Sequence, residues 1–152
     1  MLTVKDIMTT KVVTFTPDTD IVAAARILLN KRINGAPVVD EGGRVVGVLC
    51  QSDLVAQQKR LKLPSMFTVL DAVIPLGRTD DLEREMRKIS ATTVEHAMTT
   101  EPDTVAPETP VEEVATIMSE QKLYTLPVVG ADGRLMGVVG KEDVLKTLVG
   151  KA

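Results

Sequence analysis

Asp53 and Asp143 occupy matching places in the sequence, each a few residues after an apolar run. Asp53 lies in GVLCQSDL, residues 47–54, and Asp143 lies in GVVGKEDV, residues 137–144. Both stretches read as the end of a strand that leads into a helix. An ionised carboxylate at such a junction can accept charge-assisted hydrogen bonds from a ligand, each contributing roughly 1.5–3 kcal/mol. It can equally stabilise the N-terminus of the following helix, so the ligand and cap interpretations both stay open.

Other residue types that carry out chemistry are sparse. Cys50 is the only cysteine and His96 the only histidine, and neither has a sequence partner that would make it a nucleophile or a metal ligand. Cys50, at a strand end, is typical of a small buried hydrophobe. The sequence also lacks paired acids, a glycine-rich phosphate loop and a spacing suited to metal ligands. We therefore predict no catalytic residue, no metal site and no enzymatic activity.

The composition argues against several classes of partner. The net charge is −3 and aromatic residues are 2% of the chain, so neither a basic footprint nor stacking platforms for nucleic acid are present. No apolar run approaches the roughly 20 residues that span a bilayer, and the first residues do not resemble a signal peptide. One cysteine excludes an intrachain disulfide and fits a reducing compartment. These features predict a soluble, cytoplasmic protein without a membrane partner.

The sequence contains an internal repeat. VKDIMTT (4–10) matches VEHAMTT (94–100), a displacement of 90 residues (94 − 4), and APVVDEGGRVVGV (36–48) matches LPVVGADGRLMGV (126–138) at the same displacement. The register holds without a gap from residue 4 to residue 57 and aligns Asp53 with Asp143. A match of this length indicates a duplication.

Each copy predicts the order strand, helix, strand, strand, helix. Val111, Val114 and Met118 fall on one helical face, and Thr109 followed by Pro110 predicts a capped start for that helix. PVVDEGGRVVGVL and PVVGADGRLMGVV each consist of two apolar runs joined by a glycine turn, which is typical of a hairpin. A second amphipathic helix begins near each aspartate.

A copy of about 55 residues buries too little surface to be stable alone. We therefore expect the two copies to pack sheet against sheet with pseudo-two-fold symmetry, which gives an α+β fold with equivalent clefts. Repeat 1 is predicted over residues 1–57 and repeat 2 over residues 94–152. Residues 58–93 have no counterpart and predict a short helical insertion that covers part of the module or forms a subunit contact.

The ordered motifs, found twice over residues 4–57 and 94–147, resemble the CBS domain tandem, or Bateman module. They read T-h-x-P, a helix, h-P-V-V, a glycine turn and G-h-h-x-x-x-D, where h is apolar. The resemblance implies two β-α-β-β-α units and a regulatory role. It also implies a bound adenosyl ligand (AMP, ADP, ATP or S-adenosylmethionine) in the clefts between the repeats, with Asp53 and Asp143 binding the ribose hydroxyls.

The resemblance implies further ligand-binding residues on the loops and strands around the two clefts. With the aspartates, these residues are Thr10, Ile33, Asn34, Ala36, Pro37, Cys50 and Asp53 in the first copy, and Thr100, Leu123, Tyr124, Leu126, Pro127, Gly140 and Asp143 in the second. The apolar members read equally well as core residues. Tyr124 would either stack on a base or cover the core with its hydroxyl in water.

The sequence departs from the family pattern at two places in each copy. Three residues before each aspartate the family usually has Thr or Ser, and here the residues are Cys50 and Gly140. Just before each strand proline, nucleotide-binding members often carry a basic residue, and here the sequence has Asn34-Gly35 and Tyr124-Thr125. Without cations a di- or triphosphate is costly to bind, so ATP is less favoured than in a typical member.

Two functions follow from these features. The first is a stand-alone regulatory module that senses an adenosyl ligand and alters an unknown regulated protein, with no separate cofactor. The alternative is a structural dimerisation module whose clefts hold no ligand. The resemblance also implies a homodimer, because such modules commonly dimerise, and we expect one here.

Overall fold

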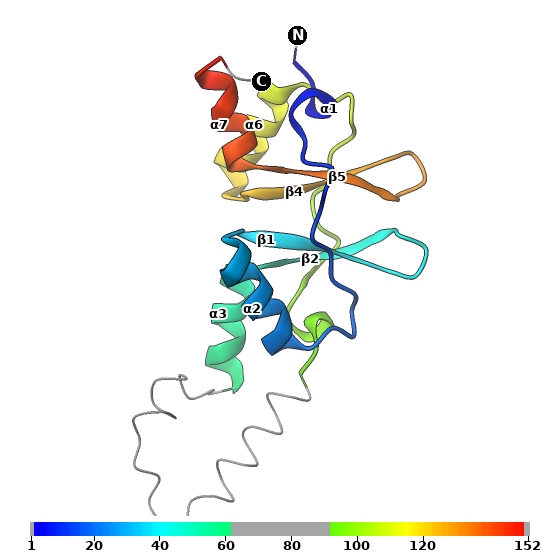
Figure 1. Ribbon diagram of the computed structural model, residues 1–152, viewed down its shortest axis with the longest axis vertical. Helices are drawn as coiled ribbons and strands as arrows, with labels where there is room; N and C mark the ends of the chain where they lie inside the picture. The colour runs from blue at the N-terminus through cyan, green and yellow to red at the C-terminus, as the bar shows by residue number, and fades with distance from the viewer. Residues whose placement is uncertain (1, 62–91, 151–152) are drawn as a thin grey trace, which may run out of the picture.

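The computed structural model describes residues 2–61 and 92–150. Two small antiparallel sheets stack on one another, and the longer helices lie on their outer sides (Figure 1). This arrangement confirms the predicted α+β fold of two β-α-β-β-α units packed through their sheets. The predicted insertion falls on residues 62–91 for the most part and so lies outside the described residues.

The two halves have the same order of elements. The first half contains α2 (Ile21–Lys31), β1 (Gly35–Val39), β2 (Val45–Cys50) and α3 (Gln51–Leu61). The second half contains α6 (Val111–Gln121), β4 (Thr125–Val129), β5 (Leu135–Gly140) and α7 (Lys141–Leu148). In each half the two strands form the predicted hairpin, with Pro37 paired to Val48 and Pro127 paired to Val138.

The helix starts follow local capping chemistry, with one difference from the prediction. The Asp20 carboxylate caps α2 by accepting a hydrogen bond from the Ala23 N–H at 2.9 Å. At α6 the cap position is Pro110 rather than the predicted Thr109. The Thr109 hydroxyl instead accepts from the Ala106 N–H at 3.1 Å, which closes the turn before the helix.

The first segment of each copy packs on the other half of the molecule. Helix α1 (Val4–Ile7) lies beside α6, where the Val4 N–H donates to the Thr109 carbonyl at 2.8 Å. The 3₁₀ helix η1 (Val94–His96) lies beside α2, where the Val94 N–H donates to the Thr19 carbonyl at 2.8 Å. The two halves therefore exchange their leading segments.

The exchange continues into the sheets. Strand β3 (Thr99–Thr100), which begins the second copy, pairs with β2 of the first copy through Thr99 and Val48. In the same way Thr9 pairs with Val138 of β5. Each crossing backbone passes close to a strand glycine: a Cβ atom at Gly137 would lie 2.8 Å from the Thr9 carbonyl oxygen, and one at Gly47 would lie 2.9 Å from the Thr99 carbonyl oxygen. Glycine at these positions makes the crossing possible.

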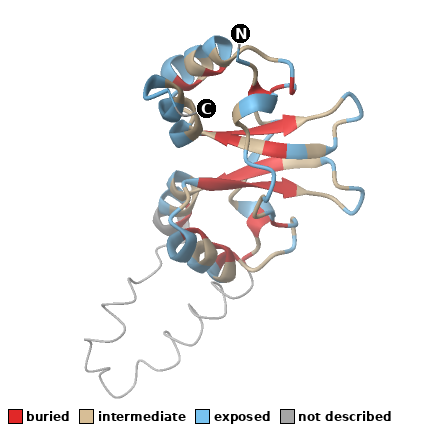
Figure 2. Ribbon diagram, turned by 45° about the horizontal axis from the view of Figure 1, so that its top comes forward, coloured by how far each residue is buried: buried red, intermediate tan, exposed pale blue. Residues whose placement is uncertain are grey.

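The exchange also determines the composition of the two hydrophobic cores (Figure 2). Val94 belongs to the cluster of the first half, with Leu28, Val38 and Leu49, and Val4 belongs to the cluster of the second half. Both valines are fully buried. Each half is thus completed by a segment that belongs to the other copy in sequence.

The hairpin tips join the two halves a second time. The Val45 N–H donates to the Gly133 carbonyl at 3.2 Å, and the Leu135 N–H donates to the Gly43 carbonyl at 3.0 Å. These two bonds are related by the same displacement of 90 residues (133 − 43) as the sequence repeat. Among the described residues, no helix has the length and apolar character needed to cross a bilayer.

Candidate functional site

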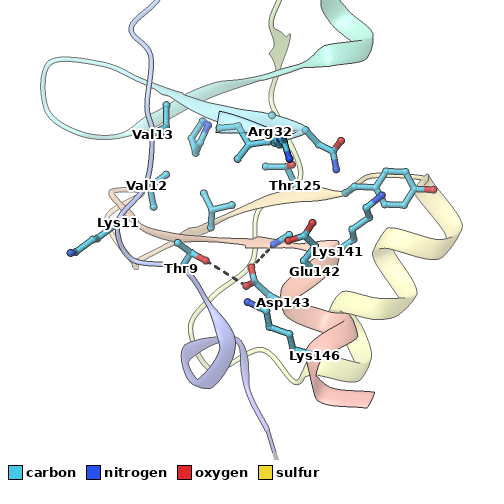
Figure 3. A pocket seen from close by; sticks show the side chains of 17 residues that line it. Thr9, Lys11, Val12, Val13, Arg32, Thr125, Lys141, Glu142, Asp143 and Lys146 are labelled. Carbon is cyan, nitrogen blue, oxygen red and sulfur yellow. Dashed lines mark hydrogen bonds between the residues drawn. The ribbon is translucent and has the colours of Figure 1, made fainter. Parts of the chain in front are cut away.

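A pocket of about 260 Å³ opens between the two halves, on the side where β1 and β4 begin (Figure 3). Its volume is near the lower end of the range for small-molecule sites, roughly 300–1,000 Å³. The first half contributes Thr9, residues 11–13, residues 32–35 and Pro37 of β1 to the lining. The second half contributes residues 124–125 at the start of β4, Val138 of β5, residues 140–143 at the start of α7, and Lys146. A ligand bound here would therefore contact both halves at once.

Asp143 lines this pocket and caps α7 at the same time. Its Oδ2 accepts a hydrogen bond from the Gly140 N–H at 2.8 Å, in the first turn of the helix. Its Oδ1 lies 3.5 Å from the Thr9 hydroxyl, which comes from the exchanged N-terminal segment, and Figure 3 shows the two side chains facing one another. The two interpretations of this carboxylate are thus compatible, because one oxygen serves the helix and the other faces the pocket.

Asp53 has the same local geometry in the first half. Its Oδ2 accepts from the Cys50 N–H at 2.8 Å, and its Oδ1 lies 3.4 Å from the Thr99 hydroxyl. Burial raises the pKa of the Asp53 carboxyl, while the bonds from Cys50 and Thr99 oppose that shift. Burial, with the neighbouring Asp53 charge, also raises the pKa of the Cys50 thiol to about 11. The thiol is therefore protonated at neutral pH.

The residues predicted from the sequence separate into two groups. The members that line the pocket are Ile33, Asn34, Pro37, Tyr124, Gly140 and Asp143. The members outside its lining are Thr10, Ala36, Cys50, Asp53, Thr100, Leu123, Leu126 and Pro127. Ala36 and Leu126 are only 1% exposed and belong to the two hydrophobic clusters.

The threonine that faces the pocket is Thr9, next to the predicted Thr10. Thr9 pairs with Val138 and directs its hydroxyl toward Asp143, whereas Thr10, which is exposed like Thr9, does not line the pocket. Thr99, rather than Thr100, has the matching contact with Asp53. Neighbouring side chains of an extended chain point to opposite sides. A shift of one residue, from Thr10 to Thr9, therefore changes which side chain is directed toward the pocket.

The pocket carries positive charge that the sequence analysis did not place there. Four basic residues line it, namely Lys11, Arg32, Lys141 and Lys146, together with the carboxylates of Glu142 and Asp143. The positions next to the strand prolines do lack a cation, as the sequence indicates, but these four residues come from other segments. A comparison of the two copies position by position would have found this signal, because Lys141 and Lys146 align with Gln51 and Ala56.

The rest of the lining is largely apolar. Val12, Val13, Ile33, Pro37 and Val138 provide a surface on which a flat heteroaromatic ring can be buried. The Tyr124 ring, 47% exposed, stands at the edge with the Lys141 ammonium 5.4 Å from its centre. The pocket therefore combines an apolar part with a carboxylate and several cations.

Comparisons with known proteins place this geometry in a family. CBSX2, a chloroplastic CBS domain-containing protein of Arabidopsis thaliana, is 29% identical over 134 residues, which are 86% of this chain and 56% of CBSX2. The crystal structure of CBSX2 in complex with AMP matches with a TM-score of 0.75 and 28% identity, covering 99% of this chain and 98% of that chain. The chain thus spans about half the length of the full CBSX2 sequence.

Two further relatives agree with this result. The CBS domain pair of protein MJ0100, in complex with 5′-methylthioadenosine and S-adenosyl-L-methionine, matches with a TM-score of 0.73 and 28% identity over 100% of this chain and 99% of that chain. The uncharacterized protein MJ1426 of Methanocaldococcus jannaschii is 26% identical over 98% of this chain and 92% of its own length. A sequence profile of the CBS domain matches residues 4–59 and 94–150. The chain belongs to the CBS domain family, as a tandem of two CBS repeats.

Proposed function

We propose that this protein is a regulatory module that senses an adenosyl ligand in the pocket at Asp143. The observation that carries the proposal is the position of the Asp143 carboxylate, which has one oxygen in the helix cap and the other in a pocket between the repeats. In the proposed complex Oδ1 accepts a hydrogen bond from the ribose, and the base lies on the surface formed by Val12, Val13 and Ile33.

The pocket lining suggests how binding would be transmitted. Thr9 belongs to the first copy but pairs with Val138 of the second, and Asn34 directly precedes β1 while Tyr124 directly precedes β4. A ligand that contacts these segments favours the arrangement of the two halves in which they all meet. Binding would thereby bias the packing of the repeats, and a partner protein that senses this packing would be regulated.

Two relatives support the chemical class of the ligand. The CBSX2 structure contains AMP, and the MJ0100 structure contains 5′-methylthioadenosine and S-adenosyl-L-methionine. All three compounds carry an adenosyl group. The identity of the group attached to the ribose differs among them, so the relatives alone do not choose between a phosphate and a sulfonium ligand.

The test is a thermal-shift and calorimetric titration with adenosine, AMP, ADP, ATP and S-adenosylmethionine. At least one ligand should raise the melting temperature of the wild-type protein. Asp143→Asn keeps an oxygen for the helix cap but loses the charge, so it should weaken binding by about 1.5–3 kcal/mol. Asp53→Asn is the matched control and should bind normally. Absence of binding by the whole panel at millimolar concentration would reject the proposal.

A homodimer is the second part of the proposal. Val55 of α3 and Leu145 of α7 occupy equivalent positions in the two copies and are 66% and 52% exposed, and Leu148 is 80% exposed. Helices α3 and α7 lie on the same side of the stacked sheets (Figure 1). Apolar side chains at equivalent positions on one side favour a partner surface there. Leu145→Glu should therefore reduce the sedimentation coefficient from that of a dimer to that of a monomer.

The same observation favours the alternative function, a dimerisation module without a ligand. That function predicts a dimer whose sedimentation coefficient and melting temperature do not respond to any adenosyl compound. A response to one of them would count against it.

A further inference from the structure

The charge around the pocket carries an inference about the ligand class, which rests on the proposed function. We infer that the Asp143 pocket selects adenosyl ligands that carry a phosphate and rejects those that carry a sulfonium. We further infer that the surroundings of Asp53, which does not line this pocket, do not accept a phosphate ligand, so that each chain binds a single nucleotide.

The first argument is the origin of the cations. Arg32 follows α2 of the first half, whereas Lys141 and Lys146 lie on α7 of the second half, and all three line the pocket with Asp143. In Figure 3 Arg32 lies across the pocket from Asp143, while the Lys11 side chain extends away from it. An anionic ligand that contacts cations from both halves would stabilise the arrangement in which the halves lie together.

The second argument is that these cations are not held in salt bridges with other described residues. Among the described residues, Arg134 and Asp132 form a salt bridge. None of the basic residues that line the pocket takes part in a salt bridge with a described residue. The Lys141 ammonium instead rests over the Tyr124 ring, a weak contact that a phosphate can replace. Binding of a phosphate would therefore not require an existing ion pair to be broken.

The third argument is the direction of α7. The helix begins at Lys141, and Gly140, Lys141, Glu142 and Asp143 all line the pocket. The first N–H groups of a helix and its dipole favour a negative group at this end. The Gly140 and Lys141 N–H groups already donate to the Asp143 carboxylate and the Tyr124 carbonyl, so it is the dipole of α7 that adds to the attraction of the basic side chains for a phosphate.

The fourth argument is the different charge at the equivalent positions of the other copy, where most of the basic residues are replaced by neutral or acidic ones. Lys141 and Lys146 correspond to Gln51 and Ala56, and Lys11 corresponds to Glu101. Val13 corresponds to Asp103, so a carboxylate replaces an apolar side chain. At these positions Arg32 alone has a basic counterpart, Lys122. The acidic counterparts Glu101 and Asp103 thus disfavour a phosphate near Asp53.

The ligand class follows from these charges. AMP carries a phosphate at the 5′ position of its ribose, whereas S-adenosylmethionine carries a sulfonium cation there. In the proposed complex the ribose is bound at Asp143 and its 5′ substituent is directed toward Lys141 and Lys146 of the same helix. A phosphate is stabilised at that position, and a sulfonium is repelled.

The experiment is an isothermal titration with adenosine, AMP and S-adenosylmethionine, on the wild-type protein and on the double variant Lys141→Gln/Lys146→Gln. AMP should bind the wild type at least about tenfold more tightly than adenosine, because it gains charge-assisted contacts. In the double variant this ratio should fall toward unity while adenosine binds as before. Lys5→Gln, an exposed lysine on α1 that does not line the pocket, is the matched control and should keep the ratio.

The outcomes separate this inference from the proposed function. If adenosine and AMP bind equally to the wild type, or if S-adenosylmethionine binds as tightly as AMP, the charge selection is wrong and the adenosyl site remains. An unchanged ratio in the double variant would equally overturn the assignment to Lys141 and Lys146. If none of the compounds binds, the proposed function itself is wrong. Adenosine binding also shows that each variant is folded.

Discussion

The Thr9 hydroxyl lies 3.5 Å from the Asp143 carboxylate, although 134 residues separate them in the sequence. The equivalent pair, Thr99 and Asp53, lies 3.4 Å apart in the other half. Both contacts exist because the leading segment of each copy crosses to the other half and pairs with its sheet. The candidate site is therefore a product of the exchange, and neither repeat could form it alone.

The exchange makes a prediction about energetic coupling. Val4 is fully buried in the cluster of the second half, with Val128, while Val38 belongs to the other cluster. Each valine replaced by alanine should lower the free energy of unfolding by about 2 kcal/mol. In urea denaturation, Val4→Ala and Val128→Ala should couple by more than about 0.5 kcal/mol, whereas Val4→Ala and Val38→Ala should add. Additivity in the first pair and coupling in the second would contradict the exchange.

The crossing points predict a large effect for a small substitution. A Cβ atom at Gly137 would lie 2.8 Å from the Thr9 carbonyl oxygen and 2.9 Å from the Met8 sulfur. Gly137→Ala should therefore lower the free energy of unfolding by about 1–3 kcal/mol. Gly42→Ala is the control, because its nearest neighbour would be the Asp40 carboxylate at 3.4 Å, and it should change stability by less than about 0.5 kcal/mol. Equal melting temperatures of the two variants would argue against the close approach.

Gly140 offers a gain-of-function test at the pocket. Its φ of −106° suits any residue, and an added Cβ would lie at ordinary contact distances of 3.6 Å from the Tyr124 carbonyl and 3.8 Å from Asp143. Gly140→Ser restores the hydroxyl that the family usually has three residues before the aspartate. One additional neutral hydrogen bond should tighten the binding of AMP by about threefold to tenfold. Gly140→Ala adds the same carbon without the hydroxyl and should leave the affinity near that of the wild type.

The pKa shifts predict opposite pH dependence for two aspartates. Burial raises the pKa of Asp53, so the folded state binds its proton more tightly than the unfolded state, and stability is lost as the pH rises from 3.8 through the raised pKa. The Thr3 N–H lowers the pKa of Asp6, so Asp6 contributes stability above 3.8 that is lost as the pH falls through the lowered pKa.

Urea titrations of Asp53→Asn and Asp6→Asn between about pH 3 and pH 7 test these signs. Relative to the wild type, Asp53→Asn should gain stability as the pH rises. Asp6→Asn should lose stability at neutral pH, and the loss should shrink in acid. The same direction of change for both variants would contradict the shifts.

The sequence predicts much of the fold because the duplication repeats each local signal. The glycine turns and alternating apolar runs define the hairpins, and the aspartates mark the starts of α3 and α7. The exchange was not predictable in the same way, because the repeat register shows which residues are equivalent but not which half a leading segment packs against. Gly47 and Gly137 belong to the repeated motif that ends in the aspartate. Their structural role, which is to allow the close approach of a backbone from the other copy, is visible only in the fold.

Of the two aspartates predicted from the sequence, Asp143 lines the pocket and Asp53 does not, and the positive charge of the pocket was not predictable. Asp143, Asn34 and Gly140 reach the pocket as expected, since all lie at strand ends next to the sheet proline or the helix cap. Thr9 replaced Thr10 because an extended segment changes its face at every residue. Lys141 and Lys146 were not predictable as site residues because exposed lysines on a helix are ordinary, and only the geometry shows that they border a pocket.

The most direct test of the account is equilibrium dialysis with labelled AMP, to measure the number of nucleotides bound per chain. The wild-type protein and Asp53→Asn should each bind a single AMP per chain at saturation, and Asp143→Asn should lose most of its affinity. Two equivalent AMP molecules per chain would contradict the difference between the clefts. Binding that survives Asp143→Asn but disappears in Asp53→Asn, or no binding in any of the proteins, would contradict the assignment of the site to Asp143.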